Sequence, residues 1–159
     1  MALPTGTLSH CTVCIALSTN GTTWTDFSTY LGIIEPSAMT RTTGETALFG
    51  NDAKLLSQGK KEAFDITIRG VYADSTATTN PFAYVWGQWT TSCGGALAVR
   101  WAPAGCATTN QVFSTATATG HNSKLVSLTP PNGDADSGDA LMWEAVIRTG
   151  DLWKAAYVA

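Results

Sequence analysis

Only two side chains in this 159-residue sequence are of the type whose ordinary pKa suits a base at neutral pH. His10 and His121 are the two histidines, and an imidazole is the side chain that titrates near neutral pH. The sequence contains no G-x-S-x-G nucleophile motif, no H-E-x-x-H zinc motif and no phosphate-binding P-loop. Carboxylate pairs for glycoside hydrolysis are defined by their separation in space, so no pair stands out from sequence. We therefore expect no enzymatic activity, no catalytic residues and no cofactor.

A turn-rich acidic segment invites comparison with a calcium-binding loop. Its aspartates are Asp134, Asp136 and Asp139. An EF-hand-like loop starting at Asn132 would need Gly at its sixth position and Glu at its twelfth. The sequence has Ser137 and Trp143 there, so we expect a solvated acidic turn and no metal site.

The four cysteines suggest different kinds of chemistry. They are Cys11, Cys14, Cys93 and Cys106. A zinc site would need two close pairs, and only the first two cysteines are close in sequence. Cys93 and Cys106 bracket an alternating run and could meet. We expect buried free thiols, with one disulfide as the main alternative and zinc as the least favoured.

Composition argues against a nucleic-acid-gripping surface. The net charge is −3, the pI is about 5.2, and no run of Lys or Arg occurs. A surface that holds phosphates needs clustered cations. Charged residues make up 13% of the chain, about half the usual share, and there are six tryptophans. This indicates a surface covered by other copies, or a secreted Thr-rich β-protein. No signal-peptide pattern and no apolar run of membrane-spanning length is present, so we expect synthesis in the cytoplasm.

Alternating apolar and polar residues predict about seven strands. Residues 11–18 and 22–27 are expected to form a hairpin around Asn20-Gly21, with Trp24 on its core side. Residues 64–72 place Phe64, Ile66, Ile68 and Tyr72 on one face. Asp65, Thr67 and Arg69 lie on the other. Residues 96–103 form another strand. In the last strong strand, Leu141, Trp143, Ala145 and Ile147 oppose Glu144 and Arg148.

One short helix is expected after this central strand. Asn80 can cap it, and Pro81 suits its first turn because the missing N–H is not needed there. The spacing i, i+3, i+4, i+7 then predicts one aromatic stripe packed on the core. Its members are Phe82, Val85, Trp86 and Trp89.

Three segments are expected to lie outside the sheet core of this single domain, residues 1–159. Residues 1–10 read as an N-terminal arm and residues 150–159 as a C-terminal arm that carries Trp153 and Tyr157. Residues from about 36 to 61 have no sustained period and read as a long loop. Several apolar residues of this loop would be exposed to solvent in a single chain, which suggests that the loop is ordered against another subunit. Its candidate contact residues are Arg41, Glu45, Leu48, Phe49, Leu55 and Leu56.

The predicted fold is mainly β: a two-sheet β-sandwich or partly open barrel with one flanking α-helix. The order of the segments resembles the tail tube (major tail) proteins of long-tailed phages (siphophage-type). The resemblance runs through GTTWTDFSTYLGIIEPS, TRTTGET, KKEAFDITIRGVYAD, NPFAYVWGQW, GGALAVRWAPAG and PPNGDADSGDALMWEAVIRTGDL, and is weakest between residues 105 and 125.

The resemblance implies a structural virion protein of the phage tail, assembled in the host cytoplasm. Six copies would form a ring whose inner sheets join into a shared barrel. Rings would stack through the long loop and the arms. The lumen would hold a tape-measure protein and conduct double-stranded DNA without specific binding, and a tail terminator would be a further partner. No membrane contact is implied. The lumen candidates are Asp65, Thr67, Arg69 and Glu144, with Arg148 an additional one; the two arginines could instead pair with carboxylates.

Two other readings remain open from sequence. A tail terminator or head–tail connector could share the fold and stop at single rings. A carbohydrate-binding β-sandwich could use exposed tryptophans as stacking platforms for sugar rings. Against it, Trp86, Trp89, Trp101 and Trp143 lie in patterns that predict burial, which leaves Trp153 and Trp24.

Overall fold

The computed structural model of the chain describes residues 13–48, 53–73, 80–91, 95–107, 109–117, 119–133 and 138–156. The expectations for Phe49, Tyr157, His10, Cys11, Cys93, Asp134, Asp136 and residues 1–10 lie outside these ranges. The elements in chain order are β1 (Cys14–Ser18), β2 (Thr25–Asp26), β3 (Leu31–Pro36), β4 (Arg41–Thr46), β5 (Leu55–Lys61), β6 (Phe64–Val71), α1 (Pro81–Trp89), β7 (Ala98–Ala102), β8 (Gln111–Ser114), β9 (Ala116–Thr117), β10 (Gly120–His121), β11 (Ser123–Asn132), β12 (Met142–Thr149) and β13 (Trp153–Ala156).

Two antiparallel sheets face each other across one apolar core. One has the strand order β11-β12-β6-β3 and the other β13-β8-β7-β1-β2. Ile66 and Ile68 of β6 are fully buried, as is Ile147 of β12, and Leu17 and Val99 meet them from the second sheet. Each such side chain contributes about 1.5–3 kcal/mol when fully buried. The predicted mainly-β sandwich with a flanking helix is confirmed.

The predicted first hairpin is present, but Trp24 is not in the core. β1 and β2 pair antiparallel, with Ala16 opposite Asp26, and Gly21 takes a φ of 78° in the connecting turn. Trp24 is half-buried, and the guanidinium of Arg100 lies 4.8 Å from its ring centroid. The tryptophan therefore covers the outer face of the five-stranded sheet.

The helix begins as predicted and packs differently. The side chain of Asn80 accepts a hydrogen bond from the backbone N–H of Phe82, and Pro81 occupies the first turn. Val85 is fully buried, and Phe82 packs edge-on against Trp143. Trp86 and Trp89 are 44% and 45% exposed, so their predicted place in the core is wrong. Trp86 follows Val85 by one residue, which turns it about 100° away from the buried face.

The cysteine expectation also needs correction. Cys14 forms a disulfide with Cys106, and the two Cα atoms lie 5.4 Å apart. Two of the four cysteines are therefore not free thiols, and Cys106 is not joined to Cys93. The pairing escaped prediction because 92 positions separate the two cysteines in sequence.

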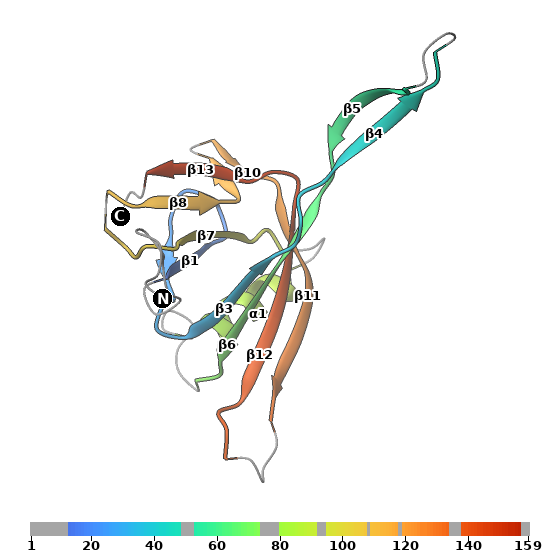
Figure 1. Cartoon of the computed structure of the whole chain (residues 1–159). Helices are drawn as coiled ribbons and strands as arrows, with labels where there is room; N and C mark the ends of the chain where they lie inside the picture. The colour runs from blue at the N-terminus through green and yellow to red at the C-terminus, as the bar shows by residue number, and fades with distance from the viewer. Residues whose placement is uncertain are drawn as a thin grey trace, which may run out of the picture.

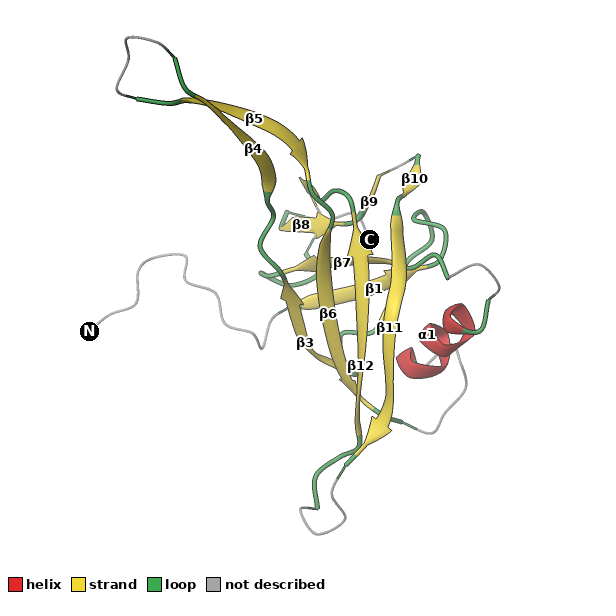
Figure 2. Ribbon diagram, turned by 90° about the vertical axis from the view of Figure 1, so that its right-hand side faces the viewer, coloured by secondary structure: helices red, strands yellow, loops and turns green. Residues whose placement is uncertain are grey.

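The segment predicted to be a long loop is a β-hairpin. β4 and β5 pair antiparallel from Arg41–Lys61 at one end to Thr46–Leu55 at the other. Figures 1 and 2 show the hairpin projecting well beyond the two sheets. Neither strand has a buried face, so apolar and polar residues do not alternate along them strongly enough to be recognised as strands. The C-terminal segment likewise contains β13, which pairs with β8 at the edge of its sheet.

No helix in the described ranges is long and apolar enough to cross a membrane.

Candidate functional site

The outer face of the β11-β12-β6-β3 sheet is largely polar, and most of its charges are paired. Cross-strand register places Asp65 opposite Arg148 and Arg69 opposite Glu144. Arg148 donates from Nε and Nη2 to the two carboxylate oxygens of Asp65, at 2.7 and 2.9 Å. Arg69 donates from Nε to Glu144, and its Nη2 lies 3.9 Å from a carboxylate oxygen of Glu35. The two arginines thus pair with carboxylates, as one of the two sequence-based readings allowed.

These pairs shift the titration of their members in the expected directions. The hydrogen bonds from Arg148 lower the pKa of Asp65 below its ordinary value, partial burial opposes this shift, and the charge of Arg148 adds to it. The hydrogen bond to Glu144 raises the pKa of Arg69. Both pairs are substantially solvent-exposed, so their contribution to stability is small.

Charge balance is the chief electrostatic property of this face. Lys124 of β11 is opposite Arg148 and adds a third cation. Three cations (Lys124, Arg69 and Arg148) thus face three carboxylates (Glu35, Asp65 and Glu144). Thr67 lies among them on β6, half-buried. A face whose charges are balanced and mostly paired does not concentrate the cations that phosphate binding requires.

The edges of this sheet are open along part of their length. Among the described strands, β3 pairs only with β6. At the other edge, the first residues of β11 bond to residues 95–97, through Leu97 N–H to Ser123 and Leu125 N–H to Gly95. From Val126 onward β11 has no described strand partner on that side, where α1 packs beside it (Figure 2), and Pro130 and Pro131 close its far end to pairing. Short unpaired edges of this kind are available for pairing with another chain.

The β4–β5 hairpin presents apolar side chains to solvent on both of its faces. Every residue of both strands is exposed. Leu55 and Leu56 are 56% and 70% exposed, and Leu48 is 46% exposed. Glu45 pairs with Lys54 at 2.8 Å near the tip. A two-stranded ribbon without a covering layer is marginally stable on its own, so a surface that covered these leucines would stabilise the hairpin.

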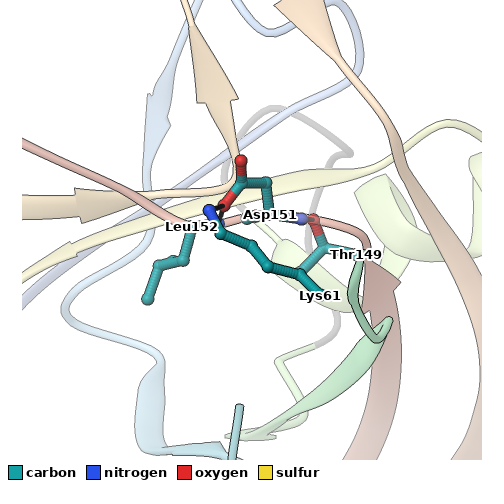
Figure 3. A network of polar contacts seen from close by, with 4 residues as sticks. All are labelled: Lys61, Thr149, Asp151 and Leu152. Atoms are coloured by element: carbon teal, nitrogen blue, oxygen red, sulfur yellow. Dashed lines mark hydrogen bonds and ion pairs between the residues drawn. The ribbon is translucent and has the colours of Figure 1, made fainter. Parts of the chain in front are cut away.

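The root of the hairpin is tied to the body by a polar network (Figure 3). Lys61 at the end of β5 donates to Asp151 at 2.9 Å, across 90 positions of sequence. The same carboxylate oxygen accepts from the backbone N–H of Leu152, and the buried Thr149 hydroxyl donates to the backbone carbonyl of Asp151. The hydrogen bond from Lys61 lowers the pKa of Asp151, and the charge of nearby Arg41 adds to this. This network links the root of the hairpin to the segment between β12 and β13.

Two further groups of tryptophans lie at the surface. Trp86 and Trp89 are on the solvent side of α1, which packs beside β11 (Figure 2). Trp153, 47% exposed, and Trp24 line one depression of about 650 Å³ on the five-stranded sheet, together with Arg100 and Lys154. Of the six tryptophans only Trp101 and Trp143 are buried, where the sequence patterns predicted four.

Sequence reasoning missed the partners of the charged residues. The alternation in residues 64–72 located Asp65, Thr67 and Arg69 correctly on the polar face. Glu35 and Lys124 also belong to this face, and strand alternation could have found them once the pairing of β3 and β11 was known. No sequence signal pointed to the Lys61–Asp151 pair.

Chains of several tail and injection particles share this fold. A chain of the PVC sheath–tube complex, from an extracellular contractile injection system in its extended state, aligns with a TM-score of 0.67 and 16% identity, over 96% of this chain and 93% of that chain. A chain in the anti-feeding prophage cap, a tube-terminating cap, aligns with a TM-score of 0.67 and 15% identity, over 98% and 95%. A chain in the tail of an empty GTA particle aligns with a TM-score of 0.61 and 13% identity, over 91% and 96%.

The TM-scores show a common fold, and at identities this low the similarity shows nothing more than the fold. The matched chains come from contractile injection systems and from the tail of a GTA particle, so the shared fold does not single out long-tailed phages. No family model and no curated protein matches the sequence.

Proposed function

We propose that this chain is a structural subunit of a tail tube, built from stacked rings of identical copies. The observation that carries the proposal is the β11-β12-β6-β3 sheet, which combines a charge-balanced polar face with partly unpaired edges at β3 and β11. Edge-to-edge pairing of such sheets would satisfy their free backbone groups and close them into one barrel. The fold shared with chains of tail and injection particles supports this reading.

In this proposal the polar face lines the lumen. Asp65, Thr67, Arg69 and Glu144 would face the cargo, with Arg148 held by Asp65. Balanced charges would let double-stranded DNA pass without being held, because few counterions are released on contact. A ring of six copies, a tape-measure protein within the lumen and a terminator at the end follow from the sequence resemblance. So does the assignment to a virion assembled in the host cytoplasm. The chain is assigned no catalytic step.

The projecting hairpin would connect successive rings. Leu48, Leu55 and Leu56 are the exposed apolar residues that a neighbouring ring would cover. The Lys61–Asp151 contact would hold the hairpin at a constant angle, so each ring would meet the next in the same orientation.

A tube terminator is the second candidate, because chains in a tube-terminating cap and in a sheath/tube terminator also share the fold. A terminator uses the same ring contacts but stops further growth. Assembly behaviour separates the two functions.

The test is electron microscopy of the purified protein over a range of concentrations. Hollow tubes of uniform width are expected. Closed single rings that do not stack would favour the terminator. A protein that remains monomeric at high concentration, and also in the presence of preformed tube ends of its own particle, would overturn both readings.

A further inference from the structure

The outer face of the five-stranded sheet brings together two cysteines and a carboxylate. Cys14 begins β1, Asp26 ends β2, and Cys106 follows β7 in a turn. The two sulfur atoms and a carboxylate oxygen of Asp26 all lie within 4.8 Å of one another. In the oxidised chain the sulfurs are bonded to each other, so these ligand atoms become available only on reduction.

We propose that the reduced chain binds one zinc ion through Cys14, Cys106 and Asp26. Two thiolates and a carboxylate are ligands that Zn²⁺ accepts, and soft sulfur ligands select against Mg²⁺ and Ca²⁺. Zinc–ligand bonds of about 2.0–2.3 Å place tetrahedral ligands somewhat under 4 Å apart. The two sulfurs must therefore move apart once their bond is broken, and the carboxylate, which lies within 4.8 Å of them, need move inward by no more than about 1 Å. Solvent water would fill the fourth position.

The ligands from β1 and β2 are already oriented by one hydroxyl. Ser28 Oγ donates to Asp26 Oδ1 and lies 3.5 Å from the sulfur of Cys14, and it accepts from the backbone N–H of Ile15 at 2.9 Å. The backbone N–H of Ser28 also donates to Asp26 Oδ1, at 2.8 Å. Within the described part of the chain, Asp26 Oδ2 has no hydrogen-bond partner. Outer-shell hydrogen bonds of this kind orient metal ligands and strengthen binding.

The turn that carries Cys106 is held without the disulfide. The Asn110 side chain donates to the carbonyl oxygens of Ala104 and Gly105, at 2.9 and 3.0 Å. The backbone N–H of Gly105 donates to Ala102. Cys106 should therefore stay beside Cys14 after the sulfur–sulfur bond is broken.

Access and shielding also suit a metal ion. Cys14 is 2% exposed and packs with Ala102 and Val112, so one side of the site is dry. Cys106 and Asp26 are exposed, which leaves an entry path from solvent. In a reducing compartment zinc would link β1 to the turn after β7, as the disulfide does under oxidising conditions.

Reduction of the Cys14–Cys106 disulfide requires a reductant of the phosphine or thiol class. A phosphine and one water convert the disulfide into two thiols and yield the phosphine oxide. Each thiol then loses one proton as its sulfur binds zinc, so two protons are released for each ion bound.

The test measures metal uptake by the full chain, with cobalt(II) as a visible substitute for zinc. Protein reduced with a water-soluble phosphine is titrated with Co²⁺ and then with Zn²⁺. One cobalt per chain is expected, with sulfur-to-cobalt charge-transfer absorption that zinc abolishes. The oxidised protein should take up none. Cys106→Ser should abolish uptake and Asp26→Asn should weaken it at least about tenfold. Asp139→Asn, which removes the same charge elsewhere, should change nothing.

Three results would overturn the proposal: no uptake by the reduced chain, undiminished uptake by Cys106→Ser, or equal affinity in Asp26→Asn. Asp26 is exposed, so Asp26→Asn should fold, and Cys106→Ser lacks only the disulfide that the reduced chain also lacks, so the two are compared at equal stability; circular dichroism verifies the fold of each. The outcome does not depend on tube assembly, because the measurement is made on the dissolved chain.

Discussion

Breaking the Cys14–Cys106 disulfide should cost this protein a large part of its stability. The bond closes a loop of 92 positions between β1 and the turn after β7. In the chain-entropy model, closing a loop of that length lowers the entropy of the unfolded chain enough to stabilise the fold by about 4.6 kcal/mol at 25 °C. For a domain of this size, a loss of that amount lowers the melting temperature by roughly 9–18 °C.

The assay is denaturant and thermal unfolding of oxidised and reduced protein, with a chelator present so that no metal replaces the bond. Cys106→Ser is the preferred variant, because Cys106 is exposed whereas Cys14 is packed in the interior. It should match the reduced protein, and reductant should not affect it further. A difference below about 1 kcal/mol between oxidised and reduced protein would refute the entropic reasoning, as would an equal response of Cys106→Ser to reductant.

Other consequences of the structure can be checked separately. Replacing Leu55 and Leu56 by Ser should leave the stability of the free chain within about 0.5 kcal/mol. The side chains of Leu55 and Leu56 are 56% and 70% exposed, and burying them in a contact between rings is worth about 2–4 kcal/mol. The critical concentration for tube growth, measured by pelleting, should therefore rise about 30- to 700-fold in the double variant. Unchanged growth would exclude the hairpin from the contacts between rings. The pKa of Asp65 is lowered in the folded protein, so the stability that its ionised carboxylate contributes is present above the ordinary pKa of 3.8 and is lost as pH falls through the lower folded value. Unfolding titrations of Asp65→Asn at several pH values should lack this acid dependence. A pH profile identical to that of the unchanged protein would contradict the ion pair. Gly70→Ala would place a Cβ 2.9 Å from a neighbouring carbonyl oxygen and should destabilise by about 1–3 kcal/mol, whereas Gly32→Ala, with nothing within 4 Å, should be nearly neutral in the same melt.

The local sequence pattern was sufficient to predict those strands and helices that have one buried face and one face exposed to solvent. The alternation of residues 64–71 predicted β6 and its polar face, because burial on a single side of a strand forces a period of two. Asn80 and Pro81 predicted the start of α1, because a helix N-terminus must satisfy its own free N–H groups. The two-sheet sandwich follows from several such strands, since each must cover its apolar face against another layer.

The local sequence pattern failed to predict elements that are not half-buried, because only burial of one face imposes a regular spacing of apolar residues. The β4–β5 hairpin is exposed on every residue, so nothing in its sequence alternates strongly enough to mark a strand. The stripe on α1 was overestimated because the helix touches the core along a narrow line through Val85, which leaves Trp86 and Trp89 outside.

The sequence by itself determined which residues enter the half-buried strands, which face of β6 and β12 is apolar, and where the helix starts, because these depend on neighbours a few positions away. The tertiary structure decided which distant residues meet. Cys14 with Cys106 and Lys61 with Asp151 are joined across 92 and 90 positions, and Asp65 meets Arg148 only through strand pairing. Such contacts depend on how the strands are ordered in the sheets, and many strand orders are compatible with the same local alternation.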